Sequence, residues 1–301
     1  MNARERGFLL LASCFGNAER CPLTVAQLRT LAKRVQAMDR SETDRELTQA
    51  DLAACGYGQN MSLRILSLLS QEAELAYYLQ KAKRYGCTPI TRVSADYPHV
   101  LHRRLQLDCP GVLWAKGDIS LLKQPAISLV GSRDISPENR RFAEEAGRQA
   151  ALQGYTLVSG NARGADRIAQ ESCLAAGGNV IVVAADGIAE KREEKRILYL
   201  CEDSFDLSFS AQRALSRNRI IHCLGKIVLV AQCTWQSGGT WSGTVKNLTC
   251  GWSPVFCFDD GSTTVENLEQ MGAERISLEG LDCLTALTKQ QQSIFDESFL
   301  K

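Results

Sequence analysis

Three short loops of the sequence combine glycine with hydroxyl or amide side chains, and two of them add arginine, a combination that proteins use to hold phosphate groups. They are Gly131-Ser132-Arg133, Ser159-Gly160-Asn161-Ala162-Arg163-Gly164 and Ser237-Gly238-Gly239-Thr240. Glycine lets a ligand approach the backbone closely, and free backbone N–H groups at the start of a helix favour an anion. Arg133 and Arg163 add guanidinium groups that can form two parallel hydrogen bonds to one phosphate. A single loop of this kind is more simply explained as a tight turn between a strand and a helix. Three such loops together favour an anion-binding surface.

Two other charged segments stand outside these loops. Arg217-Asn218-Arg219 can present guanidinium and amide donors to a phosphate chain, and a solvated helix face explains it equally well. In residues 191–196 the charges alternate in pairs, which predicts a solvated helix. The candidate phosphate ligands are therefore Gly131, Ser132, Arg133, Ser159, Gly160, Asn161, Arg163, Gly164, Arg217, Asn218, Arg219, Ser237, Gly238, Gly239 and Thr240.

Catalytic and metal-binding patterns are missing from the sequence. It has no Gly-x-Ser-x-Gly, no His-Glu-x-x-His, and neither the dinucleotide fingerprint nor the phosphate-loop motif. Its 12 cysteines include no Cys-x-x-Cys and it has only 3 histidines, so no zinc site is expected. His222 lies among apolar residues and predicts a satisfied core histidine, while Asp166 is expected to cap its helix. We expect a binding protein with no cofactor and no metal, rather than an enzyme.

The composition is that of a globular protein. Of the 301 residues, 45% are hydrophobic and 23% are charged, which excludes a disordered or low-complexity chain. The net charge is only +1, so a polyanion has to be bound by local clusters of arginine. No run reaches the roughly 18 apolar residues of a membrane span, and the start lacks an export-signal pattern. We therefore expect a cytosolic protein with reduced thiols and no membrane contact.

The elements that must position the loops are buried strands followed by helices. Apolar runs occur at residues 127–130, 155–158, 180–184, 227–231 and 255–258, and helical patterns separate them. Ser136-Pro137 has the form of an N-cap and first helical residue, and that helix runs to Gln153. Continuous apolar strands that alternate with helices predict an α/β fold with a doubly wound parallel sheet. In such sheets the ligand lies beyond the carboxyl ends of the strands, where these loops fall.

The part of the chain before residue 88 predicts a small all-helical module of four or five helices. Thr24 and Gln27 have capping-box spacing, and a second helical pattern runs from Leu63 to Ala82. Residues 88–124 carry Pro89, Pro98 and Pro110 and predict an irregular connector or extension of the core. We divide the chain into a helical module at 1–87, this connector, a core at 125–281 and a short tail at 282–301.

Motifs along residues 88–275 resemble those of the DNA-processing protein A (DprA, also Smf) family. The matching stretches, in chain order, are Ala95-Asp96-Tyr97-Pro98, Asp108-Cys109-Pro110-Gly111, Val130-Gly131-Ser132-Arg133, Ser159-Gly160-Asn161-Ala162-Arg163-Gly164-Ala165-Asp166, Arg217-Asn218-Arg219-Ile220-Ile221, Ser237-Gly238 and Gly272-Ala273. The resemblance implies an extended Rossmann-like domain that binds single-stranded DNA through a basic pocket. On that pattern Arg133, Arg163, Arg217 and Arg219 hold phosphates, and the small loop residues let the strand approach.

The resemblance also implies partners. Family members typically form homodimers and load a RecA-type recombinase onto incoming strands during natural transformation. The sequence departs from the family pattern at Gln170, where a histidine is usual, and at Gln232, where an acidic residue is usual. The roughly 20 residues after Leu281 leave no room for the winged helix that many relatives carry. A divergent member can instead serve antiphage defence, with a genomically linked effector protein as its partner.

Two other functions use the same loops. A sensor of a nucleotide-derived ligand needs the same convergent arginines, and ligand length distinguishes it from a DNA-binding protein. The segment from Ser237 to Thr244 loosely resembles a motif of nucleotide phosphoribohydrolases. That enzyme needs a glutamate near the loop, and none occurs from Cys233 to Phe258, so the enzyme is the less favoured alternative.

Overall fold

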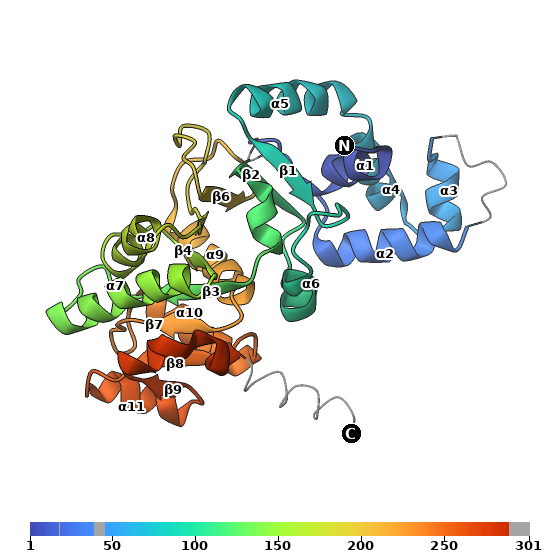
Figure 1. Ribbon diagram of the computed structural model, residues 1–301. Coiled ribbons are helices and arrows are strands. Elements are labelled where there is room, and N and C mark those ends of the chain that lie inside the picture. The colour runs from blue at the N-terminus through green and yellow to red at the C-terminus, as the bar shows by residue number, and fades with distance from the viewer. Residues whose placement is uncertain (18, 39–45, 289–301) are drawn as a thin grey trace.

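The computed structural model describes residues 1–17, 19–38 and 46–288, which fold around one nine-stranded sheet (Figure 1). The strand order is β1-β2-β6-β5-β4-β3-β7-β8-β9. In this spatial order, all neighbours from β6 across to β9 are parallel. At the other edge, β1 pairs antiparallel with β2, and β2 pairs antiparallel with β6. Within these residues no helix is both long and apolar enough to cross a bilayer. The predicted α/β fold with a doubly wound, mostly parallel sheet and N-terminal helices is confirmed.

The elements follow one another with short connections. The strands are β1 (Thr88–Thr91), β2 (Val112–Gly117), β3 (Ala126–Val130), β4 (Thr156–Ser159), β5 (Val180–Val183), β6 (Ile197–Glu202), β7 (Val228–Val230), β8 (Val255–Phe258) and β9 (Glu274–Ile276). The α-helices are α1 (Ala3–Ala12), α2 (Val25–Gln36), α3 (Gln49–Ala54), α4 (Gln59–Leu69), α5 (Glu72–Arg84), α6 (His99–Leu105), α7 (Pro137–Leu152), α8 (Ala165–Ala175), α9 (Ala211–Leu224), α10 (Gly238–Cys250) and α11 (Thr263–Gln270). Short 3-10 helices are η1 (Gln106–Asp108), η2 (Ile119–Lys123) and η3 (Glu279–Cys283).

Both faces of the sheet are buried, which explains the continuous apolar runs in the sequence. On β5, Val180 and Val182 belong to one hydrophobic cluster, while Ile181 and Val183 belong to another. Helices α7 and α8 cover the first face, and α9 covers the second. Because successive side chains of a strand point to opposite faces, a strand buried on both sides cannot alternate apolar with polar residues.

The chain reverses direction across the sheet at β3. It runs outward from β3 through β4 and β5 to β6, and then returns by α9 to β7, which pairs with the other side of β3. The loops after β3 and β7 therefore leave neighbouring strands on either side of this reversal. Such a reversal point opens a crevice at the carboxyl ends of the strands, where doubly wound proteins bind their ligands.

Several local predictions are confirmed. Ser136 caps α7, because its hydroxyl accepts a hydrogen bond from the N–H of Asn139 at 3.3 Å. Thr24 and Gln27 form the expected capping box at the start of α2. Among the described residues, five helices precede β1. The helical pattern from Leu63 to Ala82 is divided between α4 and α5.

Two local predictions are wrong. Residues 191–196 form a loop between β5 and β6 instead of a solvated helix, because alternating charges report exposure to water and not conformation. Residues 88–124 are not irregular, since they contain β1 and β2. β1 tolerates Pro89 because it is an edge strand, where a missing N–H donor costs little. The domain boundaries themselves stay a prediction, and residues 289–301 of the predicted tail lie outside the described residues.

The N-terminal helices lie beyond the β1 edge of the sheet (Figure 1). Tyr78 of α5 shares a cluster with Trp114 of β2 and Phe205, and the three rings contact one another at centroid distances of 4.8–5.3 Å. At the polar end of this contact, Lys81 forms an ion pair of 2.6 Å with Asp206. The Tyr78 hydroxyl donates to the same carboxylate at 3.2 Å. Helix α5 is thus attached to the loop between β6 and α9.

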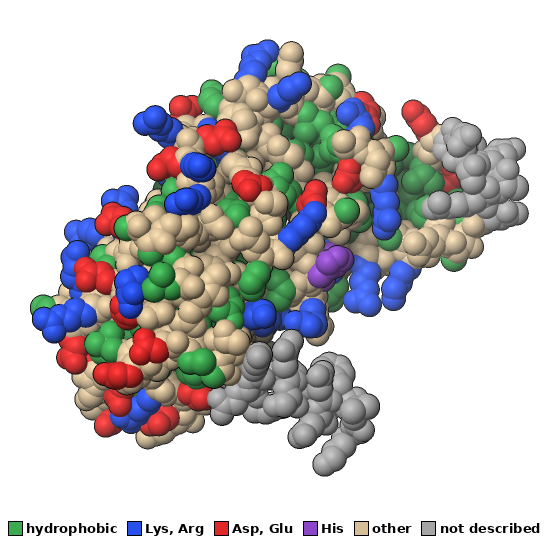
Figure 2. Space-filling view, viewed as in Figure 1, with side chains coloured by type: hydrophobic (Ala, Val, Ile, Leu, Met, Phe, Trp, Pro, Cys, Tyr) green, Lys and Arg blue, Asp and Glu red, His purple; other side chains and the backbone are tan. Residues whose placement is uncertain are grey.

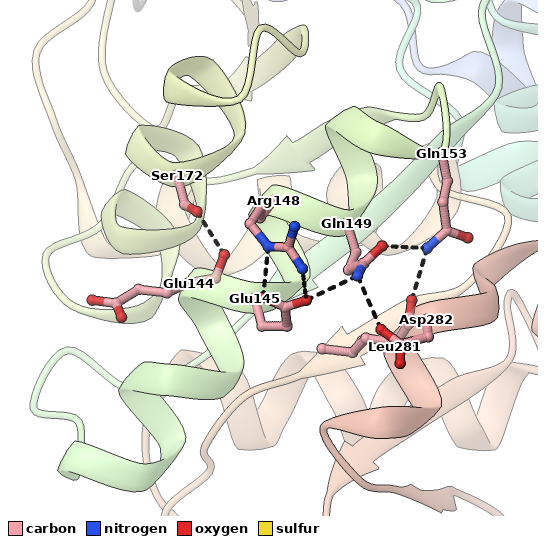
Figure 3. Close-up of polar contacts among 8 residues, drawn as sticks. All are labelled: Glu144, Glu145, Arg148, Gln149, Gln153, Ser172, Leu281 and Asp282. Atoms are coloured by element: carbon pink, nitrogen blue, oxygen red, sulfur yellow. Dashed lines mark hydrogen bonds and ion pairs between the residues drawn. The ribbon is translucent and has the colours of Figure 1, made fainter.

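Helix α7 is held by polar contacts from its middle to its C-terminal end (Figure 3). Its Glu144 carbonyl accepts a hydrogen bond from Ser172 of α8 at 2.6 Å. On the other side, Gln149 donates to Asp282 at 3.0 Å and Gln153 donates to the Leu281 carbonyl at 2.8 Å. The segment after β9 is therefore fastened to the helix that follows β3.

Replacing Tyr78 with alanine should lower the free energy of unfolding by about 3–5 kcal/mol, because a buried aromatic ring leaves a cavity among Trp114 and Phe205. Urea denaturation measures this change. The neighbouring Tyr77 is 67% exposed and provides a matched control, whose alanine variant should stay within about 0.5 kcal/mol of the unchanged protein. Equal effects of the two variants would contradict the packing described here.

Candidate nucleic-acid interface

The three loops singled out in the sequence meet at the carboxyl ends of the central strands. They line a cleft of about 570 Å³, which we call the central cleft, whose walls include Gly131, Ser132 and Arg133 after β3 and residues 237–240 at the start of α10. A second hollow of about 540 Å³, the loop hollow, adjoins it and includes Asn161, Arg163 and Arg167. Arg133, Phe209 and Arg217 line both, so the two hollows form one continuous site.

Arg217 of α9 is buried beneath the loop that follows β4. Its guanidinium donates to the carbonyl of Gly160 at 3.1 Å, and its Nε has no hydrogen-bond partner in the described part of the chain. A Cβ atom at position 160 would lie 1.6 Å from Nη1 of Arg217, so only glycine leaves room for this arginine. Burial lowers the pKa of the Arg217 guanidinium, and the nearby carboxylate of Asp166 opposes that shift.

Asp166 lies in the first turn of α8 and is buried. Its carboxylate accepts hydrogen bonds from the N–H groups of Gly160 at 3.1 Å and Ala162 at 3.2 Å. The expected role as a simple cap is therefore corrected, because the N-cap is Gly164 and Asp166 instead holds the preceding loop. Burial raises the pKa of the Asp166 carboxyl, while Arg217 and the two backbone amides lower it.

Most of the hydroxyl and amide groups predicted to hold phosphate are already used to join the loops. The Thr240 hydroxyl donates to the Gly131 carbonyl at 2.9 Å, and the Asn218 amide donates to the Gly239 carbonyl at 3.1 Å. The N–H of Ser132 donates to the Gln232 carbonyl at 3.0 Å. Ser159 is fully buried, and its hydroxyl accepts a hydrogen bond from Gln170. These side chains give the cleft its shape, so any ligand must be held chiefly by other groups.

The arginines at the site differ in whether they are paired with a carboxylate. Arg133 and Arg167 are exposed and form no ion pair within the described residues. Arg163 pairs with Asp134 at 2.6 Å, but the two side chains are 72% and 91% exposed, so this pair is weak. Figure 2 shows basic and acidic side chains interspersed over the visible face, in agreement with the near-zero net charge. Local groups, not bulk charge, must therefore attract an anion.

Arg219 does not lie with the other predicted ligands. It is two residues after Arg217, which turns it by about 200° around α9. Its Nε donates to the Asp108 carbonyl at 3.1 Å, and its guanidinium forms an ion pair with Glu202. The structure thus separates Arg219 from the cleft by the width of the helix.

Sequence reasoning missed the exposed aromatic side chains. Phe209 is 58% exposed and lines both hollows, just before the Ser210 cap of α9. Trp235 is 42% exposed, lies in the loop between β7 and α10, and contacts Trp241 at 4.7 Å between ring centroids. The available signal was weak, because Phe209 stands between two serines in a polar segment, yet Phe205 in the same segment belongs to the core.

His222 of α9 also belongs to the lining of the central cleft, and it is fully buried. Its Nδ1 lies 3.2 Å from the Asn247 amide, while its Nε2 has no partner in the described part of the chain. The prediction of a satisfied core histidine is therefore correct for one ring nitrogen only. Burial lowers the pKa of the His222 imidazole to about 4, so the ring is neutral at pH 7.

The fold and this site define a class of protein: a doubly wound α/β protein with arginines and glycine-rich loops gathered at the reversal point of its sheet. A family model described as DNA recombination-mediator protein A matches residues 88–278. The chain belongs to this family, and the resemblance to DprA and Smf proteins drawn from the motifs is confirmed.

Individual relatives agree with the family model. The chain is 33% identical over 141 residues to DNA processing protein DprA of Streptococcus pneumoniae, covering 44% of this chain and 50% of that protein. It is 32% identical over 142 residues to protein Smf of Escherichia coli, covering 44% of this chain and 38% of that protein. The chain spans about half the length of the curated relatives that it matches.

Solved structures show the same fold. The X-ray structure of DprA from Streptococcus pneumoniae has a TM-score of 0.66 at 25% identity, over 87% of this chain and 98% of that one. A structure of DNA processing protein A from Helicobacter pylori, reported for its single-stranded DNA binding mode, has a TM-score of 0.56 at 23% identity. It covers 66% of this chain and 96% of that one, and supports the fold alone.

Replacing Gly160 with alanine should lower the free energy of unfolding by about 1–3 kcal/mol, because the new methyl group must displace the buried Arg217. In an Arg217→Ala background the same change should cost clearly less, giving a coupling energy of about 1 kcal/mol or more in a double-mutant cycle. Gly7→Ala is the control, since nothing lies within 4 Å of its Cβ position. Additive effects of the Gly160 and Arg217 changes would disprove the steric contact.

Stability should fall as the pH drops from about 6.5 to about 4, in part because of His222. Its pKa is lowered on folding, so within this window the unfolded chain binds a proton that the folded chain does not. At about 1.4 kcal/mol per pKa unit, the contribution lost is about 3 kcal/mol. Urea denaturation at both pH values should show a shallower pH dependence for His222→Gln than for the unchanged protein. Identical slopes in the two proteins would refute this assignment.

Proposed function

We propose that this protein binds single-stranded DNA, without sequence preference, along the central cleft and the loop hollow. The observation that carries the proposal is Phe209, an exposed ring that lines both hollows together with Arg133. Proteins that bind single strands combine a basic groove for the backbone with aromatic side chains on which bases stack. Bases within a duplex are already stacked on both faces, so an aromatic side chain of this kind favours the single strand.

The role we propose for the site is binding and not catalysis. Asp166 is engaged by two backbone amides, and His222 is buried and neutral at pH 7. Neither group is placed to transfer a proton to or from a ligand in the cleft. The exposed Arg133 and Arg167 remain protonated and can hold phosphates but cannot act as acid or base, while the carboxylates of Asp134 and Asp186 at the same hollows pair with Arg163 and Lys191.

The finer role follows from the family resemblance. We propose that the bound strand is protected and passed to a RecA-type recombinase, and that the protein acts as a homodimer. A genomically linked effector is the alternative partner. A small nucleotide ligand is the alternative for the site, because 570 Å³ is within the usual size of a small-molecule pocket. Continuity of the central cleft with the loop hollow favours a chain-like ligand over a single nucleotide.

Fluorescence anisotropy with a labelled single-stranded oligonucleotide tests the proposal. Arg133→Ala should weaken binding about tenfold, equal to about 1.4 kcal/mol, and should reduce the dependence of affinity on salt. Phe209→Ala should weaken binding by about 1–3 kcal/mol with the salt dependence unchanged, since stacking involves no counterion release. Arg141, an exposed arginine of α7 outside the site, provides the control Arg141→Ala, which should bind as the unchanged protein does.

Failure of the unchanged protein to bind single strands at low salt would contradict the proposal. Thermal shift with small phosphorylated nucleotides then decides whether the site serves as a nucleotide sensor. Equal affinity for a duplex of the same length would leave DNA binding standing and would contradict the proposed role of Phe209.

A further inference from the structure

The segment between β6 and α9, residues 203–210, runs from the N-terminal helices to the proposed binding site, and we call it the linker segment. Near its start, Phe205 is fully buried, and its ring contacts those of Tyr78 and Trp114. Near its end, Phe209 is 58% exposed and lines both the central cleft and the loop hollow. Only three residues separate the two phenylalanines, so fixing the first restricts where the second can lie.

Asp206 fastens the linker segment to α5. Its carboxylate forms the ion pair of 2.6 Å with Lys81 and accepts the hydrogen bond of 3.2 Å from the Tyr78 hydroxyl. The hydroxyl of Ser204 donates to the same carboxylate. The Asp206 side chain is 18% exposed, so water screens this ion pair less than it screens an exposed one. Three donors therefore hold one carboxylate, and two of them belong to α5.

The linker segment also supports the loop that follows β5. The N–H of Gly187 donates to the Leu207 carbonyl at 2.5 Å, and the N–H of Ala189 donates to the Phe205 carbonyl at 2.9 Å. A Cβ atom at position 187 would lie 2.7 Å from the Phe205 carbonyl oxygen, so the two backbones are in close contact. Residues 184–186, at the start of this loop, line the loop hollow. The linker segment and this loop thus form one wall of the site.

Asp206 and the N-terminal helices influence the site without being part of it. Among the described residues, none from α1 to α5 lines the central cleft or the loop hollow, and neither does Asp206. We propose that Asp206 is a positioning residue for DNA binding, which acts through the linker segment to hold the ring of Phe209 where a base can stack on it. This proposal rests on the proposed function, and it adds a role for α5 in setting the affinity of a site that α5 does not contact.

The physical reason is the order of the Phe209 ring before DNA arrives. A ring that is already held in place loses less conformational freedom when a base stacks on it. If the linker segment is released from α5, the ring occupies the binding position for only part of the time. The affinity for the strand then falls by the fraction of time that is lost.

Replacing Asp206 with alanine removes all three contacts of the carboxylate and tests the proposal. In anisotropy titrations with the labelled single strand, Asp206→Ala should bind about fivefold more weakly, or about 1 kcal/mol, at low and at high salt alike. Removing a carboxylate by itself favours binding of a polyanion, so the expected loss has the opposite sign to the charge effect. Glu72→Ala is the matched control, because Glu72 of α5 pairs with Arg6 of α1 and its loss removes the same charge without breaking a contact to the linker segment.

Two further measurements identify the path of the effect. In a Phe209→Ala background, Asp206→Ala should weaken binding by less than about twofold, because the ring that Asp206 positions is then missing. A general loss of stability would not depend on Phe209. Chymotrypsin, which cuts after accessible aromatic residues, should cut after Phe209 about threefold faster in Asp206→Ala than in Glu72→Ala, since a released segment opens more often. Thermal unfolding of all variants verifies that they fold.

The outcomes separate the two proposals. Equal binding by Asp206→Ala and Glu72→Ala would overturn the positioning role and leave DNA binding in the cleft standing. An undiminished loss in the Phe209→Ala background would overturn it too, because the effect would then not pass through that ring. Equal rates of cleavage after Phe209 would contradict the attachment on which the role depends. No binding of the single strand by the unchanged protein would overturn the proposed function and this inference together.

Discussion

The burial of one arginine under one loop organises the whole site. A guanidinium taken out of water costs several kcal/mol unless its hydrogen bonds and charge are satisfied. Here the Gly160 carbonyl accepts one of its hydrogen bonds, and the carboxylate of Asp166 supplies the opposing charge. Asp166 at the same time holds the N–H groups of Gly160 and Ala162. Arg217, the loop after β4 and the start of α8 are therefore held together by these contacts, and they form a rigid support for the exposed arginines around them.

The topology of the sheet explains why this unit lies where a long ligand can reach it. The return of the chain through α9 separates the loops after β3 and β7 and opens the crevice between them. Thr240 and Asn218 then tie the start of α10 back to the β3 loop and to α9. The polar groups of the cleft are thus divided between those that hold the loops together and those that remain for a ligand. This division leaves exposed arginines and Phe209 as the principal contacts that we propose.

The fold could be predicted from the sequence further than the site could. Runs such as Val180-Ile-Val-Val show burial on both faces, and Ser136-Pro137 marks a helix start, because both signals are local. β1 and β2 were missed because β2 pairs with β6, a segment far along the chain, and β1 in turn pairs with β2. The separation of Arg217 from Arg219 follows from helix geometry and could have been predicted once α9 was recognised. The place of Phe209 in the cleft could not, since it depends on how the loop from β6 packs.

The attachment of α5 bears on how the chain can be divided. Tyr78, Trp114 and Phe205 come from the N-terminal helices, the edge of the sheet and the loop before α9, yet they form a single aromatic cluster. A shortened polypeptide beginning at β1 would place the faces of Trp114 and Phe205 in water. Such an apolar surface beside an unpaired edge strand is prone to self-association. The N-terminal helices therefore shield this aromatic cluster from water, and the chain cannot be divided at β1 without exposing it.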